Sequence, residues 1–174
     1  HRRLLDALPP AGITLVAGDI RSGKSCLAYG ILDALHQKWP DRPARVFGFP
    51  PAKQALLPPW LSATQDAEFP DDSLVLADEA YRSFYARESM AESNKFIDQF
   101  SGLAGQKGIF SIYLTQTTRK LDISLVSGAQ VFLLKKPSRL MVLLDRSALR
   151  PILAKAFDSF QRAAVPLHQC TYVV

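Results

Sequence analysis

Cysteine and histidine are scarce in this sequence, which has two cysteines and three histidines in 174 residues. The cysteines, Cys26 and Cys170, lie far apart, and a disulfide-stapled chain normally carries more of them, so we expect no disulfide framework. The histidines are scattered and show no spacing typical of metal ligands. These scarcities favour a protein of a reducing compartment, and we predict a cytoplasmic location, either in a host cell or with a virion.

Long apolar runs are absent as well. No stretch reaches the roughly 18 residues that a membrane-spanning helix needs, so we expect a soluble chain without a membrane segment. No signal peptide is recognisable after His1, although a leader lost from the start remains compatible with a chain that does not begin with methionine. The sequence stops inside an expected strand over 170–174, which suggests a truncated chain or a tail beyond it.

The composition is that of an ordinary globular domain, with 48% hydrophobic and 21% charged residues. We predict one domain over 1–174, with a core over 13–135 followed by a C-terminal helix and a last strand. The net charge is +5, which permits a polyanionic partner without proving one. Neither an internal repeat nor a low-complexity segment divides the chain.

The strongest motif is G-x-x-x-x-G-K-S over residues 18–25, the phosphate-loop pattern. A glycine-rich loop lets consecutive backbone N–H groups point at an anion, and a helix that begins there adds its positive dipole end. The lysine reaches the outer phosphates, and the serine hydroxyl can bind Mg²⁺. The predicted nucleotide-binding residues are Gly18, Asp19, Ile20, Arg21, Ser22, Gly23, Lys24, Ser25 and, in the helix that follows, Cys26, whose side chain we expect to be buried.

The surrounding pattern alternates strands and helices, which predicts a three-layer α/β fold with a mostly parallel sheet and helices on both faces. A short helix over 1–12 is expected to lead in. Strands are expected over 13–17, 44–48, 73–77, 109–115, 130–134 and 170–174, and helices over 23–38, 53–57, 94–104, 121–127 and 146–164, with a further helical region after residue 79. Residues 139–145 fit a strand or a helix equally well, and the proline-rich stretch that ends at Pro70 is the least regular.

A pair of carboxylates, Asp78 and Glu79, ends the apolar run at 74–77. This pattern is similar to the Walker B element, in which a carboxylate at the end of a buried strand holds Mg²⁺ directly or through water. Because side chains alternate along a strand, Glu79 points away from Asp78 and can act on the attacking water. The alternative is that Glu79 only begins the next helix, where an acid is favoured.

A polar residue, Gln116, follows the strand expected at 109–115. Ligands of open α/β sheets lie at the carboxyl ends of the strands, so Gln116 is a candidate contact to the γ-phosphate or to the attacking water. Its alternative interpretation is an ordinary loop residue.

These motifs together resemble the FtsK–HerA superfamily of DNA-pumping ATPases, which includes viral genome-packaging ATPases and zonular occludens toxin-like phage proteins. The matching stretches are 18–25, 74–79 and 105–116. Gln106 and Lys107 stand where many relatives have Arg-His, and the resemblance covers most of 13–135. The extra strand at 44–48 looks like that of phosphate-loop NTPases with an added strand and a catalytic glutamate. This division implies the strand order 5-1-4-3-2, with the phosphate-loop strand as 1, the Asp78 strand as 3 and the Gln116 strand as 4.

The resemblance implies a ring of identical subunits in which each supplies an arginine to its neighbour's γ-phosphate, with Gln116 as the polar sensor. Arg82, Arg87 and Arg119 are the leading candidates for that arginine, Arg146 and Arg150 are weaker ones, and a solvated surface role is the alternative for each. Double-stranded DNA is the expected partner, contacted through its backbone phosphates. The basic residues considered for this contact are Lys107, Arg119, Lys120, Lys135, Lys136 and Arg139.

We therefore predict an Mg²⁺-dependent ATPase whose hydrolysis drives DNA translocation or genome packaging. ATP rather than GTP is inferred from the family, since no guanine-reading Asn-Lys-x-Asp motif occurs. One alternative is a nucleotide or small-molecule kinase, which would need an arginine-rich lid that the chain lacks. The other alternative is a non-catalytic, ATP-binding assembly protein, as in the toxin-like phage proteins.

Overall fold

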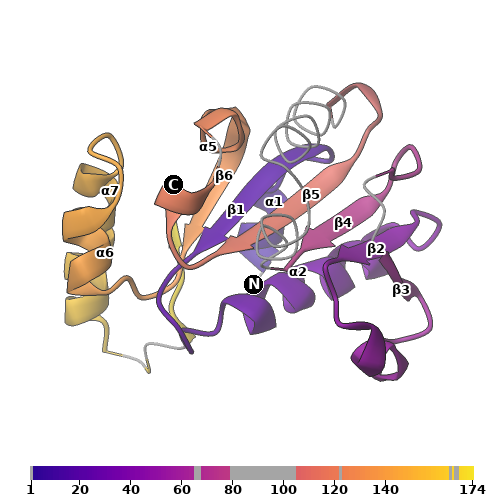
Figure 1. The fold of residues 1–174 in the computed structure, drawn as a ribbon, viewed down its shortest axis with the longest axis horizontal. Coiled ribbons are helices and arrows are strands. Elements are labelled where there is room, and N and C mark those ends of the chain that lie inside the picture. The colour runs from indigo at the N-terminus through magenta and orange to yellow at the C-terminus, as the bar shows by residue number, and fades with distance from the viewer. Residues whose placement is uncertain (1, 65–67, 79–104, 122, 165, 167–168) are drawn as a thin grey trace.

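The structure, a computed structural model, describes residues 2–64, 68–78, 105–121, 123–164, 166 and 169–174. Within these ranges the strands form one sheet in the order β3-β2-β4-β5-β1-β6-β7 (Figure 1). All neighbouring strands are parallel except β6 and β7, which are antiparallel. The strands are β1 (Gly12–Ala17), β2 (Ala44–Phe47), β3 (Leu61–Thr64), β4 (Leu74–Ala77), β5 (Phe110–Thr115), β6 (Ala129–Leu134) and β7 (Tyr172–Val173).

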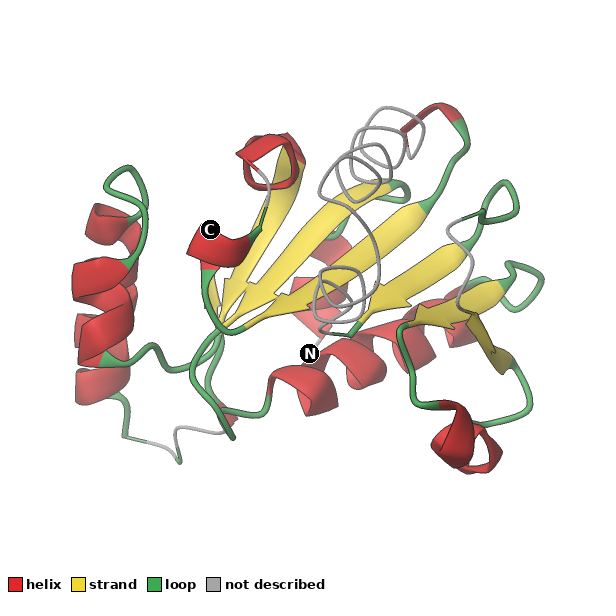
Figure 2. Cartoon of the chain, in the orientation of Figure 1, coloured by secondary structure: helices red, strands yellow, loops and turns green. Residues whose placement is uncertain are grey.

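Helices cover the sheet and the edge at which its strands end. Figure 2 shows α2 running along the sheet, while α6 and α7 pack together beside the end where β1 and β5 finish. The described α-helices are α1 (Arg2–Ala7), α2 (Lys24–Lys38), α5 (Ile123–Gly128), α6 (Arg139–Leu144) and α7 (Arg150–Arg162), and the 3₁₀ helices are η1 (Pro51–Leu56) and η2 (Thr118–Lys120). None of the described helices has the length and apolar character needed to cross a membrane.

The core has two halves because side chains alternate along each strand. In β1, Ile13 and Leu15 belong to the cluster that includes Leu153 and Ala156 of α7, whereas Val16 belongs to the cluster formed with α2. All six residues of β1 are buried, as expected of a parallel strand covered on both faces. β1 is therefore buried on both faces, and the loop that follows it starts from the core at the buried Gly18.

The predicted strand order is confirmed. In the observed sheet, β6-β1-β5-β4-β2 is the order 5-1-4-3-2, and helices lie on both faces. Two edge strands extend this order. β3, which was not predicted, pairs in parallel with β2, whereas β7 lies within the strand expected over 170–174 and pairs antiparallel with β6. The prediction of an irregular stretch up to Pro70 was therefore wrong for residues 61–64, which form a strand because the neighbouring β2 supplies backbone partners.

At three places the structure decides or corrects a local prediction. Residues 139–144, for which the sequence allowed a strand or a helix, form α6, and Ser138 accepts a hydrogen bond from the N–H of Met141 at its start. The helix expected from residue 146 begins at Arg150, with Pro151 in its first turn. The expected burial of Cys26 is wrong: its side chain is exposed, because the buried face of α2 is formed by Lys24, Ala28, Ile31, Leu32 and Leu35. The predicted helix over 94–104 and the helical region after residue 79 lie outside the described residues.

Candidate functional site

Parallel pairing brings the predicted site residues to one edge of the sheet. Ala17 of β1 lies opposite Thr115 of β5 on one side and Leu134 of β6 on the other. The next residues along the three strands are Gly18, Gln116 and Lys135, so they leave the sheet side by side. Asp78 leaves from β4, the strand on the far side of β5.

The loop between β1 and α2 is shaped by residues with positive φ. Gly18 has φ 156°, Arg21 has φ 59° and Gly23, the residue before α2, has φ 87°. The left-handed region is costly for a residue with a Cβ, so Arg21 is held there by its surroundings. Among the described residues no side chain caps the start of α2, so its first N–H groups can donate to another acceptor.

Hydrogen bonds fix the first half of the loop. The N–H of Asp19 donates to the carbonyl of Lys136 at 3.1 Å, and the N–H of Lys135 donates to the carbonyl of Ala17 at 2.7 Å. The carbonyl of Asp19 accepts from the N–H of Ser22 at 3.2 Å and from Nζ of Lys24 at 2.7 Å. The segment after β6 therefore holds the loop from one side, and Lys24 folds back over it.

The interior of the loop is tight and polar. A Cβ placed on Gly18 would lie 2.8 Å from Cβ of Lys135 and 2.9 Å from both the Lys135 carbonyl oxygen and Oγ of Ser22. Ser22 is 9% exposed, and its buried Oγ has no hydrogen-bond partner among the described residues. A buried hydroxyl without a partner costs free energy, so a polar ligand that hydrogen-bonds to the Ser22 hydroxyl would be stabilised in this loop.

Asp78 faces the helix that begins at the loop. Burial, and secondly the negative charge of Asp78, raise the pKa of Tyr29 on α2 to about 12. Ser25 and Tyr29 are four residues apart and therefore lie on the same side of α2. Asp78 therefore lies near the side of α2 that carries the exposed Ser25.

The turn after β5 has its own set of hydrogen bonds. Oγ1 of Thr115 donates to the carbonyl of Thr117 at 2.7 Å and accepts from the N–H of Thr117 at 3.2 Å, which closes a tight turn around Gln116. The carboxylate of Asp145, 2% exposed, accepts from the N–H of Thr118 at 3.1 Å, from its hydroxyl, and from the hydroxyl of Thr117 at 3.3 Å.

Arg146 completes this set by donating to the carbonyls of Thr118 and Leu121. The segment between α6 and α7 thus holds the turn that carries Gln116. Sequence reasoning missed Asp145, because nothing near it in sequence marks a carboxylate that acts 27 residues away.

The catalytic glutamate and the candidate arginines predicted from the sequence lie in different places. Glu79, Arg82 and Arg87 lie outside the described residues. Arg119 is exposed in η2, three residues after Gln116, and it is thus on the same edge as the loop. Arg146 and Arg150, the weaker candidates, point their guanidinium groups at the backbone, where Arg150 donates to the carbonyl of Asp145 at 3.1 Å.

The basic residues considered for DNA contact differ in their burial and in their surroundings. Lys135 is only 3% exposed and donates to the carbonyl of Cys170, and burial lowers its pKa, so the expectation of a solvent-facing contact was wrong for this residue. Lys107 precedes β5 and therefore lies at the edge of the sheet opposite the phosphate loop. There its Nζ is 3.7 Å from Oδ1 of Asp71. Arg139 lies over the ring of Phe157 with its guanidinium carbon 6.0 Å from the centroid. Lys136 is half-buried, and Arg119 is exposed.

Neither a scan of protein-family models nor a search of curated proteins gives a match. Solved structures do match. The chain is similar to the genome packaging NTPase B204 of Sulfolobus turreted icosahedral virus 2 in complex with sulfate, with a TM-score of 0.64 and 12% identity over 95% of this chain and 96% of that chain. The complex with AMPPCP has a TM-score of 0.61 and 12% identity over 95% of this chain and 97% of that chain. The complex with ATP-gammaS has a TM-score of 0.59 and 16% identity over 87% of each chain.

At these identities the likeness concerns the fold. The chain has a phosphate-loop NTPase fold, and nearly the whole of both chains takes part in the match. This confirms the predicted fold class, and it confirms at the level of the fold the resemblance to genome-packaging ATPases that the motifs indicated.

Proposed function

We propose that this protein hydrolyses ATP with Mg²⁺ and works as one subunit of a ring that translocates or packages DNA. The observation that carries the proposal is the loop over 18–25, which joins β1 to α2 at the edge where Gln116 and Asp78 also leave the sheet. The likeness to a viral genome packaging NTPase whose structures hold ATP-gammaS and AMPPCP supports the same activity here.

The loop fits a triphosphate. The loop has no room for a side chain at Gly18, and within the described part of the chain its buried Ser22 hydroxyl has no partner and the start of α2 has no side-chain cap. Phosphate oxygens would accept from the N–H groups at the start of α2, where the helix dipole favours negative charge. Lys24 would exchange its hydrogen bond with the Asp19 carbonyl for one with the outer phosphates.

The same edge fits a magnesium ion, because hydroxyl and carboxylate oxygens are the ligands it prefers. Ser25 and Asp78 would hold the ion, directly or through water. When bound, Mg²⁺ neutralises charge that develops on the phosphate oxygens during transfer. The residues themselves position the substrate, because Ser25 is fixed by α2 and Asp78 by β4, two elements that pack on each other.

Glu79 would take a proton from the attacking water, and Gln116 would orient that water or the γ-phosphate. The turn around Gln116 is held by Thr115 and Asp145, which keeps the backbone of Gln116 beside Gly18 at the end of β5. A positioned general base contributes about 10²–10⁴-fold to the rate of such reactions. An arginine from the neighbouring subunit would stabilise transition-state charge and would make activity depend on the ring.

Two substitutions separate binding from turnover. Lys24→Ala removes a charged hydrogen bond to the phosphates and should weaken ATP binding by about 10–100-fold. Glu79→Gln should bind ATP as the wild type does and lose about 10²–10⁴-fold in turnover. Lys155→Ala, at an exposed site on α7, is the control and should change neither.

The measurements are isothermal titration with Mg-ATPγS and phosphate release with Mg-ATP. Wild-type turnover by Glu79→Gln would contradict the role given to this residue. Transfer of the γ-phosphate to an acceptor other than water would support a kinase, and binding without any turnover would support an assembly protein.

A further inference from the structure

Tyr29 carries a buried hydroxyl to which the proposed reaction gives no role. Its oxygen is shielded from solvent and has no hydrogen-bond partner within the described part of the chain. The ring of Tyr29 packs against the apolar cluster between α2 and the sheet, which keeps the hydroxyl inside. Such a group costs free energy, and in native proteins a catalytic role or a bound water or ion is a common reason for it.

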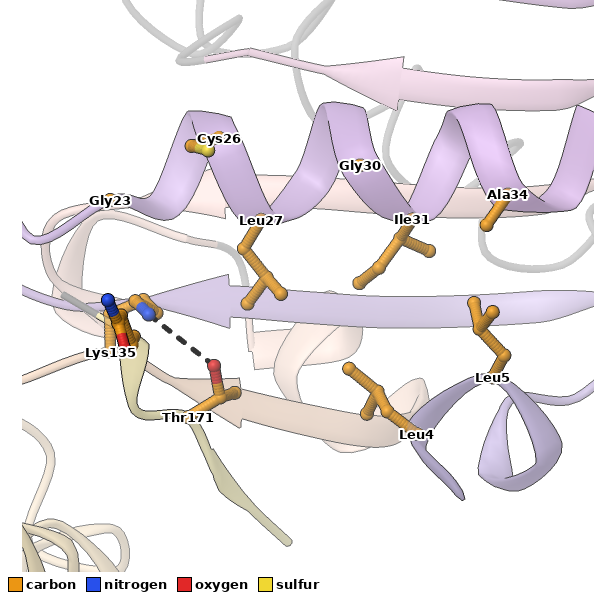
Figure 3. A pocket seen from close by; sticks show the side chains of 11 residues that line it. Leu4, Leu5, Gly23, Cys26, Leu27, Gly30, Ile31, Ala34, Lys135 and Thr171 are labelled. Carbon is orange, nitrogen blue, oxygen red and sulfur yellow. Dashed lines mark hydrogen bonds between the residues drawn. The ribbon is translucent and has the colours of Figure 1, made fainter. Parts of the chain in front are cut away.

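The helix α2 has two different flanks, and Tyr29 lies on the one that carries Ser25. Figure 3 shows the other flank, where Leu27, Ile31 and Ala34 project toward α1. A helix turns by about 100° per residue, so Ser25 and Tyr29 are about 40° apart around its axis and each is about 160° from Leu27. The Tyr29 hydroxyl therefore belongs to the metal-binding side of the predicted site and not to the side that faces α1.

Asp78 is the charged group that reaches this hydroxyl. It directly follows β4, a strand that packs against α2, and its N–H donates to the carbonyl of Phe47 of β2 at 3.3 Å. The negative charge of Asp78 is the second cause, after burial, that raises the pKa of Tyr29 to about 12. The carboxylate is thus close enough for its charge to act on the hydroxyl, although no direct hydrogen bond joins the two groups.

We propose that Tyr29 is a positioning residue for Asp78: its hydroxyl donates to a water that hydrogen-bonds to the Asp78 carboxylate, and this fixes the carboxylate in the orientation that receives Mg²⁺. The inference rests on the proposed function, because it takes Asp78 to hold the ion. Mg²⁺ in proteins keeps several of its waters, so a water beside Asp78 is in keeping with its chemistry. Groups that hydrogen-bond to metal ligands orient them, and their loss typically weakens metal binding by about 10–100-fold.

Tyr29→Phe tests the proposal because it removes the hydroxyl and keeps the ring. The affinity for ATPγS is measured by isothermal titration with excess Mg²⁺ and again in EDTA, and the ratio of the two affinities is the contribution of the ion. We expect Tyr29→Phe to lower this ratio by about tenfold and to leave the affinity in EDTA unchanged. Tyr113→Phe is the matched control, because Tyr113 belongs to the cluster on the other face of the sheet, and it should keep the wild-type ratio.

Two further measurements separate a positioning role from a structural one. At neutral pH and without nucleotide, Tyr29→Phe should unfold in urea at the wild-type midpoint or above it, because the deleted hydroxyl has no partner to lose among the described residues. In an Asp78→Ala background, Tyr29→Phe should change the affinity ratio by less than about twofold, because no carboxylate is left to orient. Asp78→Ala alone should lower the ratio at least as much as Tyr29→Phe does.

A wild-type affinity ratio in Tyr29→Phe would overturn the proposal. Equal losses of affinity with Mg²⁺ and in EDTA, together with a lower urea midpoint, would also overturn it, because the hydroxyl would then support the fold and not the metal ligand. Losses that add in the double variant would exclude an action through Asp78. If Mg²⁺ does not strengthen ATPγS binding by the wild type, or if Asp78→Ala keeps the wild-type ratio, the metal site of the proposed function itself fails, which keeps the two failures distinct.

Discussion

Replacing Asp145 tests how the turn beside the phosphate loop is held. Its carboxylate is buried between the C-terminal helices and the turn after β5, and Thr118, which donates to it through both its N–H and its hydroxyl, is fully buried. Asp145→Ala removes the acceptor of both Thr118 donors, which are fully buried, and also that of the Thr117 hydroxyl and of the N–H of Arg146. Asp145→Asn keeps one oxygen in place and should cost about half as much.

The expected loss follows from these contacts. A buried donor left without a partner costs about 1–3 kcal/mol, and the two donors of Thr118 together with the weaker one of Thr117 give a loss of about 3 kcal/mol in the free energy of unfolding. With a urea dependence of about 2 kcal/mol per molar, the unfolding midpoint falls by about 1.5 M. The rate of ATP hydrolysis should fall too, because the same turn carries Gln116.

Urea unfolding followed by circular dichroism measures this loss. Asp158→Ala is the control, since Asp158 is an exposed carboxylate on α7 and its removal should change the free energy of unfolding by less than about 0.5 kcal/mol. If Asp145→Ala were no more destabilising than Asp158→Ala, the buried hydrogen bonds would not hold the turn and the reasoning would be refuted. A normal midpoint in Asp145→Asn combined with a large loss in Asp145→Ala would show that a neutral acceptor suffices.

Two further predictions concern Tyr29 and Arg119. The pKa of Tyr29 is raised from 10.0 to about 12 in the folded protein, so its contribution to the free energy of unfolding is present below pH 10 and is lost as the pH rises toward 12. Tyr29→Phe should therefore make the urea midpoint less sensitive to pH between about pH 10 and pH 12, and an unchanged pH dependence would contradict this. Arg119→Ala should bind ATPγS normally and hydrolyse ATP about 10³-fold more slowly or worse. Mixing it with Lys24→Ala should restore part of the activity, because the second variant supplies the arginine in trans, and the absence of recovery would exclude Arg119 from that role.

Much of the fold was accessible from the sequence because its signals are local. The apolar run before Gly18 predicts β1, and the glycines and Lys24 mark the loop whatever the rest of the chain does. The strand order was implied by the resemblance of the extra strand predicted at 44–48 to the division of phosphate-loop proteins that has an added strand and a catalytic glutamate. In the structure β1 pairs with β5 so that Ala17 lies opposite Thr115, and the residues that follow them, Gly18 and Gln116, are therefore neighbours.

The rest depends on contacts between distant segments. β3 has a short, weakly patterned sequence and forms because β2 offers it backbone partners. Lys135 reads as a solvated strand end, yet the segment before β7 covers it and accepts its hydrogen bond. Asp145 becomes a support of the Gln116 turn only when α6 and α7 fold beside β5. Each of these residues has an ordinary local sequence, and its burial is set by elements far away in the chain.

Mg²⁺-dependent phosphate release from ATP, measured with and without linear double-stranded DNA, tests the central claim most directly. The wild-type protein should release phosphate only with Mg²⁺, faster when DNA is present, and Lys24→Ala should stay at background in both conditions. Phosphate release by the wild type that does not exceed that of Lys24→Ala, with or without DNA, would contradict the proposal that residues 18–25 form the active centre of a DNA-driving ATPase.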